Sequence, residues 1–148
     1  MNFKITAYDN NQHRNQVISL WTEAFGYEAP HNAPDAVIDK KVAVTDGLFF
    51  VAVVEAAVIG TVMAGYDGHR GWIYSVAVSA AHRKKGLGSA LLAFAEKRLS
   101  EKGCLKINLQ IMAENEAVEA FYRSNGYNTE KRISMGKRLA ENIPTRLP

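Results

Sequence analysis

The stretch VAVSAAHRKKGLGSALL occupies residues 76–92 and runs from apolar residues through a basic, glycine-bearing turn into a second apolar pattern. The residues before the turn favour a strand, and the leucines after it favour a helix. Backbone N–H groups at a helix N-terminus lack partners, and the helix dipole there favours negative charge. Gly86 and Gly88 leave room for an anion to approach the backbone closely. We expect this turn to bind phosphate, and more specifically a pyrophosphate, beside the basic run 82–85.

Two familiar phosphate-binding motifs do not fit this turn. A P-loop requires Lys and then Ser or Thr after its last glycine, whereas Gly88 is followed by Ser89 and Ala90. A dinucleotide-binding GxGxxG motif requires glycine at the position of Leu91. A helix start that carries only solvated basic residues is the alternative interpretation.

The flanking sequence alternates strand and helix patterns. Residues 2–8 alternate apolar and polar side chains, which is typical of a half-buried strand. A helix is expected from Asp9 to Gly26, because an apolar stripe recurs at helical spacing between them. The connection 55–57 lacks the Gly or Asn that a tight hairpin turn favours. Further strands are expected at 48–54, 58–65, 72–78 and 105–111, with one or two at 127–139, and further helices after Pro34, over 87–103 and from Asn115 to Gly126. This order predicts an α/β (α+β) sandwich of mixed sheet and helices.

Length and composition limit the class of protein. The 148 residues suit one domain, which we place at 1–140 with a C-terminal tail at 141–148. The 18 Lys and Arg exceed the 15 Asp and Glu by three, and a net charge of +3 is by itself no nucleic-acid-binding footprint. A lone Cys104 excludes an internal disulfide and a CxxC site. The longest apolar run, 48–54, is far shorter than the roughly 20 residues of a membrane span. No secretory signal begins the chain, so we expect a cytoplasmic protein.

Two motifs lie far apart in the chain. The first reads Arg83-x-x-Gly86-x-Gly88 after Val76-x-Val78, and the second reads Asn115-x-x-Val118-x-x-Phe121-Tyr122-x-x-x-Gly126-Tyr127. Together they resemble the acetyl-CoA signature and the downstream motif of the GNAT superfamily of N-acetyltransferases. The likeness spans residues 3–139, and within the superfamily the chain is similar to small uncharacterised bacterial members.

The resemblance implies both a fold and a reaction. The expected fold is a GNAT-like mixed, mostly antiparallel sheet of about six to seven strands, with two splayed central strands and about four helices. The expected co-substrate is acetyl-CoA, without a metal. The acetyl group would pass to a primary amine by direct attack in a ternary complex. The acceptor would be a small-molecule amine or a protein amine, selected by loops such as 27–33.

The resemblance also implies a coenzyme site. The backbone of Val76, Ala77 and Val78 would pair with the acyl-pantetheine arm. The N–H groups of residues 84–89 would hold the pyrophosphate, with Arg83 and Lys85 beside the nucleotide phosphates. Asn115 would reach the pantetheine, although a helix N-cap explains it about equally well. The implied coenzyme-binding residues are Val76, Ala77, Val78, Arg83, Lys84, Lys85, Gly86, Leu87, Gly88, Ser89 and Asn115.

Tyr122 is the implied catalytic acid, which would donate a proton to the leaving thiolate. A phenol with a pKa of about 10 is protonated at neutral pH and suits that role. The spacing of Val118, Phe121 and Tyr122 also fits a buried aromatic stripe. The general base is left open, because Gln110 stands where some relatives carry Glu. A water-relayed proton, or an amine captured already neutral, would then be needed.

Two other functions compete with acetyl transfer. A non-catalytic acyl-CoA-binding or sensing domain would keep the coenzyme site, and the missing carboxylate favours it. A nucleic-acid-binding domain would rest only on the basic run 82–85 and lacks aromatic platforms. His13, His31 and His82 show no metal-ligand spacing, and we expect no nucleic-acid or membrane partner. An exposed edge strand near 134–139 would allow a homodimer.

Overall fold

The computed structural model describes residues 2–26 and 32–140. The chain divides into two compact units, Met1–Asn108 and Leu109–Pro148. The expected single domain over 1–140 stays a prediction, and the expected tail at 141–148 lies outside the described residues. Within the described ranges, no helix combines the length and the apolar character needed to cross a membrane.

The first unit is built on a mixed sheet whose strands lie in chain order, β1-β2-β3-β4-β5. Neighbours from β1 to β4 pair antiparallel, and β4 and β5 pair in parallel. The strands span Lys4–Ala7 (β1), Phe49–Val54 (β2), Ala57–Tyr66 (β3), Gly71–Val78 (β4) and Ile107–Asn108 (β5). The helices span Asn10–Phe25 (α1), Pro34–Val44 (α2) and Leu87–Glu101 (α3), and the second unit contains Glu116–Ser124 (α4). The predicted mixed, mostly antiparallel α/β class is confirmed.

The number of strands differs from the prediction. The sheet has five strands in the described residues, so about six to seven was wrong. The strand expected at 105–111 is reduced to Ile107–Asn108, and 127–139 contains no strand. An alternating pattern marks the two faces of an extended segment, but a strand also needs a neighbouring backbone to complete its ladder. The sequence pattern does not supply that neighbour.

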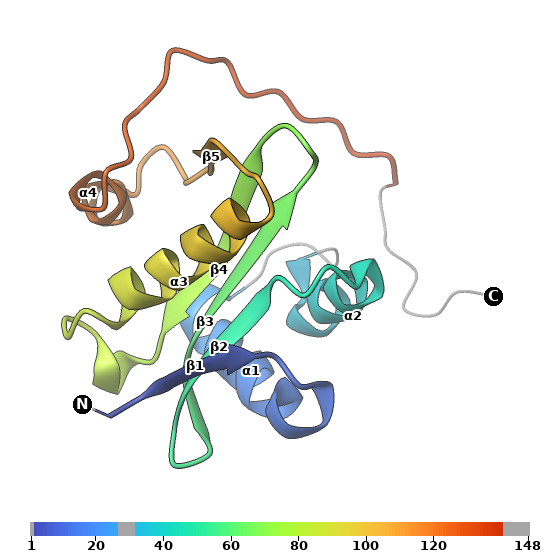
Figure 1. Cartoon of the computed structure of the whole chain (residues 1–148), viewed down its shortest axis with the longest axis vertical. Helices are drawn as coiled ribbons and strands as arrows, with labels where there is room; N and C mark the ends of the chain where they lie inside the picture. Colours follow the sequence, from blue (N-terminus) through green and yellow to red (C-terminus); the bar gives the residue numbers. More distant parts are fainter. Residues whose placement is uncertain (1, 27–31, 141–148) are drawn as a thin grey trace. The chain divides into compact units, whose positions relative to one another are not determined.

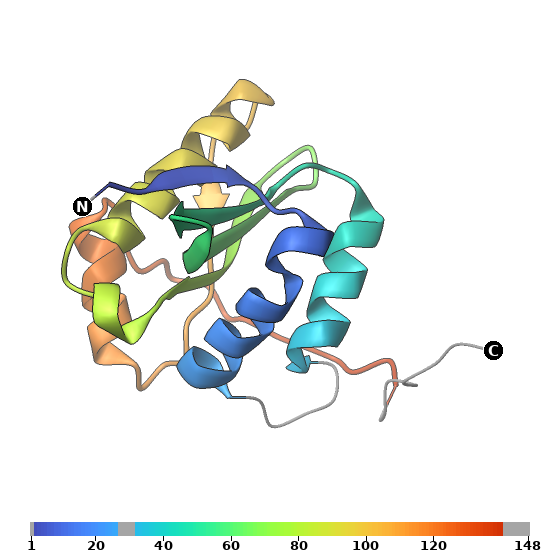
Figure 2. The ribbon, with the colours of Figure 1, turned by 90° about the horizontal axis from the view of Figure 1, so that it is seen from below.

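Helices cover both faces of the sheet, with α3 on one face and α1 with α2 on the other (Figures 1 and 2). Adjacent residues of β3 show the division. Gly60 faces α3, where an added Cβ would come within 2.8 Å of Leu91 Cδ1. Thr61 faces α1 and accepts a hydrogen bond from the indole of Trp21. The core on the α1 and α2 side contains Val17, Leu20, Trp21, Ile38, Phe49, Val51, Val58, Met63 and Ala77.

The β2–β3 hairpin has a tight turn without glycine. Glu55 and Ala56 adopt φ angles of +47° and +68°, as in a two-residue type I′ turn. Such angles cost an L-residue roughly 1–2 kcal/mol each in the left-handed region. Gln16 of α1 holds this turn, because its Nε2 donates to Ala56 O at 3.2 Å and its Oε1 accepts from Val58 N at 2.8 Å. The sequence of the turn has no Gly or Asn to indicate positive φ angles, because the turn is held by Gln16 of α1 and not by its own residues.

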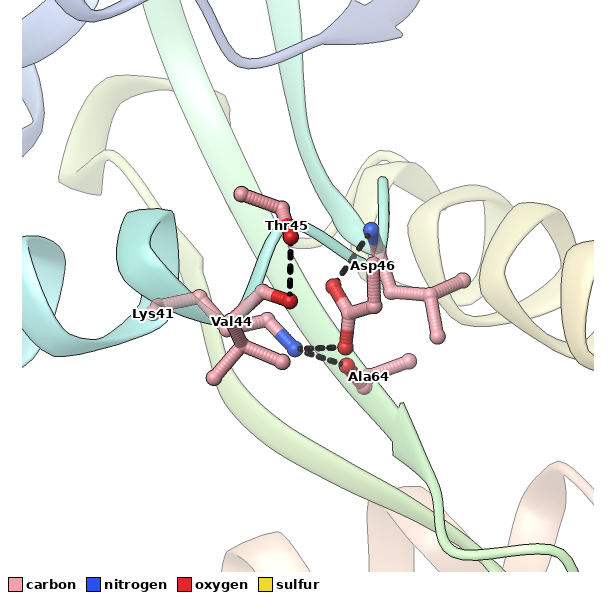
Figure 3. A network of polar contacts seen from close by, with 6 residues as sticks. Lys41, Val44, Thr45, Asp46 and Ala64 are labelled. Carbon is pink, nitrogen blue, oxygen red and sulfur yellow. Dashed lines mark hydrogen bonds and ion pairs between the residues drawn. The ribbon is translucent and has the colours of Figure 1, made fainter.

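A partly buried ion pair ties α2 to the sheet (Figure 3). Lys41 Nζ lies 2.8 Å from Asp46 Oδ2 and also donates to Ala64 O of β3. Asp46 Oδ1 accepts from Leu48 N at 3.0 Å, which fixes the entry into β2. The Lys41 side chain is only 11% exposed, so the loss of either partner would leave a poorly solvated charge.

Relaxing the strained hairpin turn should stabilise the protein. The double substitution Glu55→Asn with Ala56→Gly should raise the free energy of unfolding by about 1 kcal/mol, because Asn and Gly adopt positive φ with less strain. Urea denaturation followed by circular dichroism measures the change. Gln16→Ala should destabilise the parent more than the double variant, since the relaxed turn depends less on Gln16. Equal stabilities of parent and double variant would contradict a strained turn.

Candidate functional site

The turn that follows β4 is anchored at Ser79. Ser79 N donates to Ile59 O at 2.9 Å and so continues the contact with β3. The Ser79 hydroxyl lies 2.7 Å from His82 Nδ1, and Ser79 O accepts a hydrogen bond from His82 N at 2.9 Å. These contacts close the short 3-10 helix Ala80–His82. The basic residues that follow therefore start from a fixed point at the end of the sheet.

Arg83 and the residues after it fold the backbone into a concave loop. Arg83 Nε donates to Val78 O at 3.0 Å, so this side chain closes the loop onto the end of β4. Lys84 and Gly86 have φ angles of +61° and +80°, with Lys85 between them. Left-handed residues that alternate with ordinary ones turn successive N–H groups toward one concavity, which is an anion-binding nest. The side chains of Lys84 and Lys85 are exposed beside it.

α3 begins without a side-chain cap. Its N-cap is Gly86, no side chain accepts a hydrogen bond from its first N–H groups, and its first turn has no acidic residue. In α1, by contrast, Asp9 accepts hydrogen bonds from the N–H groups of Asn11 and Gln12. The uncapped N–H groups, the helix dipole and the adjacent bases all favour an anion at the start of α3. The structure thus brings residues 84–89, predicted to hold the pyrophosphate, and Arg83 before them into one turn.

Among the strands of the described residues, none pairs with the edge of β4 opposite β3 beyond its first residues. Its parallel pairing with β5 covers only two residue pairs, Gly71 with Ile107 and Trp72 with Asn108. From Ile73 onward, β4 pairs with β3 alone among the strands of the described residues. An extended edge of this kind can accept another extended chain. The predicted arm-binding residues 76–78 lie on this part of β4.

A bulge interrupts β4 just before these residues. Tyr74 pairs with Met63, but Ala77 pairs with Thr61, so β4 carries one extra residue at this point. Ser75 lies in the bulge with a φ of +51°. The extra residue reverses the order in which side chains of β4 point to the two faces of the sheet. It therefore decides which N–H and C=O groups of the following residues point toward the edge of β4 opposite β3.

Trp21 and Thr61 hold the bulge, and sequence reasoning did not place them at the site. Trp21 Nε1 donates to Thr61 Oγ1 at 2.8 Å, and Thr61 Oγ1 donates to Ser75 O at 2.9 Å. Trp21 is 3% exposed and Thr61 is fully buried. A single hydroxyl within the apolar run 58–65 was the available signal, because a buried hydroxyl needs partners.

In the second unit, Asn115 is the N-cap of α4. Its Oδ1 accepts from Val118 N at 3.2 Å, so the N-cap interpretation is confirmed. The helix ends where the sequence predicts, since Gly126 has a φ of +91° and Tyr127 N donates to Tyr122 O at 3.0 Å. Contact between Asn115 and pantetheine stays a prediction.

Tyr122 lies among aromatic rings of the second unit. Its ring centroid is 5.0 Å from that of Phe121 and 5.7 Å from that of Tyr127, both edge-to-face. Burial raises the pKa of Tyr122 to about 12. The phenol is fully protonated at neutral pH, which is the state that a proton donor requires. Its role as catalytic acid stays a prediction.

Gln110 is held by a hydroxyl of the same unit. Its Nε2 donates to Ser134 Oγ at 2.6 Å, and an amide offers no basic atom at neutral pH. Across residues 2–26 and 32–140, no group of three or more His, Cys, Asp or Glu side chains is placed to hold a metal ion. Residues 27–31 of the expected acceptor loop lie outside the described residues.

Comparison with known proteins identifies the class of protein that this fold and turn define. The model of the Acetyltransferase (GNAT) family matches residues 14–127. An acetyltransferase of Yersinia enterocolitica is 40% identical over 124 residues, which cover 84% of this chain and 87% of that protein. The chain belongs to the GNAT family of acetyltransferases, and the resemblance predicted from its two motifs is confirmed. It is an acyltransferase.

Solved structures share the architecture. PaiA N-acetyltransferase from Thermoplasma acidophilum in complex with coenzyme A has a TM-score of 0.77 at 18% identity, over 90% of this chain and 94% of that one. The aminoglycoside N-acetyltransferase AAC(6')-Iy in complex with CoA has a TM-score of 0.74 at 16% identity, over 94% of this chain and 96% of that one. The GNAT-like fold predicted from the sequence is confirmed.

The raised pKa of Tyr122 gives a direct spectroscopic prediction. Ultraviolet absorbance after a rapid pH jump should show a tyrosine that ionises near pH 12, because burial raises the pKa of Tyr122 to about 12 from the ordinary value of about 10. Between about pH 10 and 12 the phenol of Tyr122 keeps its proton in the folded protein but loses it in the unfolded chain. The stabilisation linked to Tyr122 is therefore complete below about pH 10 and is lost as the pH rises toward 12.

Tyr122→Phe should remove the late ionisation and leave the other tyrosines unchanged. Tyr66→Phe is the control, and it should leave the late ionisation in place. If Tyr122→Phe instead removes a group that ionises near pH 10, the phenol is not buried as described.

Proposed function

We propose that the protein is an N-acetyltransferase that moves an acetyl group from acetyl-CoA to a primary amine by direct attack in a ternary complex. The observation that carries this proposal is the uncapped N-terminus of α3 behind the basic turn 83–85, in a chain of the GNAT family. The proposed setting is the bacterial cytoplasm. The proposed acceptor is a small-molecule or protein amine. The edge strand near 134–139, on which the expected homodimer depended, does not form.

The proposed coenzyme contacts follow the geometry of the first unit. The pyrophosphate would accept hydrogen bonds from backbone N–H groups of residues 84–89, where the loop is concave and α3 is uncapped. Arg83 is already tied to Val78 O through Nε, so its remaining N–H groups and the two exposed lysines would face the nucleotide phosphates. The backbone of residues 76–78 would pair with the pantetheine arm along the edge of β4 opposite β3. Asn115 would add a contact from its amide.

The proposed reaction is a single displacement at the thioester. The amine nitrogen forms a bond to the acetyl carbonyl carbon, the carbon–sulfur bond breaks, and the nitrogen loses one proton. Tyr122 would donate its phenolic proton to the departing thiolate, which its protonation at neutral pH supports. Because Gln110 cannot take the amine proton, that proton would leave through water, or the amine would arrive neutral.

An acyl-CoA-binding or sensing domain is the second candidate, and the amide at Gln110 favours it. Such a protein would bind acetyl-CoA without turnover. Release of free thiol across a panel of primary amines separates the two functions, because only the enzyme releases thiol in an amine-dependent way. A nucleic acid is not the proposed partner, since the one dense run of basic residues, 82–85, is confined to the start of one helix and the net charge is only +3.

Removing the lysines of the turn should weaken coenzyme binding. The double substitution Lys84→Gln with Lys85→Gln should raise the Kd of acetyl-CoA about tenfold in titration calorimetry, because two charges near the phosphates are lost. Lys97→Gln with Lys102→Gln removes the same charge at the other end of α3 and should change the Kd less than twofold. Equal losses in both double variants would mean that only net charge matters. An unchanged Kd in the first would exclude a pyrophosphate at this turn.

Removing the phenolic hydroxyl should slow the chemical step. Tyr122→Phe keeps the ring and its edge-to-face contacts, so the Kd of coenzyme A should stay within about twofold while kcat falls about 100-fold. Steady-state thiol release and calorimetry measure the two quantities. Tyr127→Phe, in the neighbouring ring, is the matched control and should retain most of kcat. Unchanged kcat in Tyr122→Phe would remove this residue from the mechanism.

A further inference from the structure

We infer that Trp21 and Thr61 are positioning residues for acetyl transfer, which hold the β4 bulge in the one conformation that presents residues 76–78 correctly to the acyl arm of the coenzyme. This inference rests on the proposed function, because it assigns a task to the edge of β4. It concerns two buried side chains that lie on α1 and β3.

The bulge changes the register of β4 by one residue. Met63 pairs with Tyr74, so a regular antiparallel ladder would place Val76 opposite Thr61. Ala77 stands there instead. Without the extra residue, each later residue of β4 would turn its side chain to the other face and its N–H and C=O to the other edge. The backbone groups that the edge of β4 opposite β3 offers to an extended ligand therefore depend on the bulge.

The bulge is costly for the backbone and needs an external restraint. Ser75 has a φ of +51°, which an L-residue adopts with strain. Its carbonyl accepts a hydrogen bond from Thr61 Oγ1 at 2.9 Å. A hydroxyl has one proton, and the Thr61 proton is committed to Ser75 O because the oxygen itself accepts from Trp21 Nε1 at 2.8 Å. The direction of both hydrogen bonds is thus fixed.

Packing holds Trp21 and Thr61, the two donors of these hydrogen bonds, in place. Trp21 is 3% exposed, and its ring stacks on Phe49 with centroids 5.7 Å apart and planes 14° apart. Thr61 is fully buried in the middle of β3. A valine would fill this interior strand position as well as threonine and needs no partner. The hydroxyl of Thr61 is therefore explained by its hydrogen bond to the carbonyl of Ser75 in the bulge.

Three variants test the inference through the coenzyme itself. Thr61→Val keeps the shape of the side chain and removes both hydrogen bonds, whereas Thr61→Ser keeps the hydroxyl. Trp21→Phe keeps an aromatic ring and removes the first donor. We expect kcat/KM for acetyl-CoA to fall at least tenfold in Thr61→Val and at least threefold in Trp21→Phe. Thr61→Ser should remain within threefold of the parent.

ADP is the probe that separates the bulge from the phosphate turn. ADP carries the pyrophosphate but lacks the acyl arm, so its Kd should change less than twofold in Thr61→Val, while the Kd of acetyl-CoA rises at least fivefold. Lys41→Met is the matched control, because it removes a hydrogen bond to Ala64 O in the same strand, away from the bulge. It should lower the melting temperature and leave kcat/KM for acetyl-CoA within twofold.

The outcomes are distinct. The inference is overturned if Thr61→Val melts earlier but keeps kcat/KM for acetyl-CoA, or if Thr61→Ser loses as much as Thr61→Val. If Thr61→Val does not fold, Trp21→Phe and Thr61→Ser decide, and parent-like kcat/KM in Trp21→Phe then overturns it. Failure of the parent protein to bind acetyl-CoA would overturn the proposed function itself.

Discussion

The close approach of α3 to the sheet at Gly60 is the constraint on which the position of the turn 83–89 depends. An added Cβ at Gly60 would lie 2.8 Å from Leu91 Cδ1 and 3.1 Å from Ala77 O, so any side chain here would force Leu91 and the backbone at Ala77 to shift. Leu87 and Leu91 are then almost completely buried against the sheet. Burial of that apolar surface stabilises the helix position. The N-terminus of α3 is thereby held just after the end of β4, where its uncapped N–H groups meet the basic turn.

Three irregular points of the sheet are restrained in the same way. At each of them, where a bulge, a tight turn or a strand end departs from the regular ladder, a backbone carbonyl accepts a hydrogen bond from a side chain on another element. The side chain and carbonyl pairs are Gln16 with Ala56 O, Thr61 with Ser75 O, and Lys41 with Ala64 O. A site that needs a precise backbone edge benefits from such restraints, since a rigid frame keeps the orientation of N–H and C=O groups.

Sequence patterns predicted the elements whose signals are local. The apolar stripe of α1 and the bounds of this helix between Asp9 and Gly26 were predicted correctly, because these signals act within a few residues. The turn 83–89 before α3 was predicted for the same reason, because its glycines and basic residues are close together in the sequence. Of the strand expected at 105–111 only Ile107–Asn108 formed, and 127–139 contains no strand, because pairing depends on a partner backbone elsewhere in the chain. Trp21 and Thr61, 40 residues apart, became linked only through the fold.

The sequence by itself determined the family, the glycine-bearing basic turn after β4 and the acyltransferase class, because glycine and basic residues at fixed spacing act through the backbone directly around them. Only the tertiary structure decided how β4 meets its neighbours. The one-residue shift between Tyr74 and Ala77, the left-handed Ser75 and the buried hydroxyl that fixes its carbonyl arise from contacts among α1, β3 and β4. Hydrogen bonds between distant segments leave no period in a sequence, so they emerge only when packing brings those segments together.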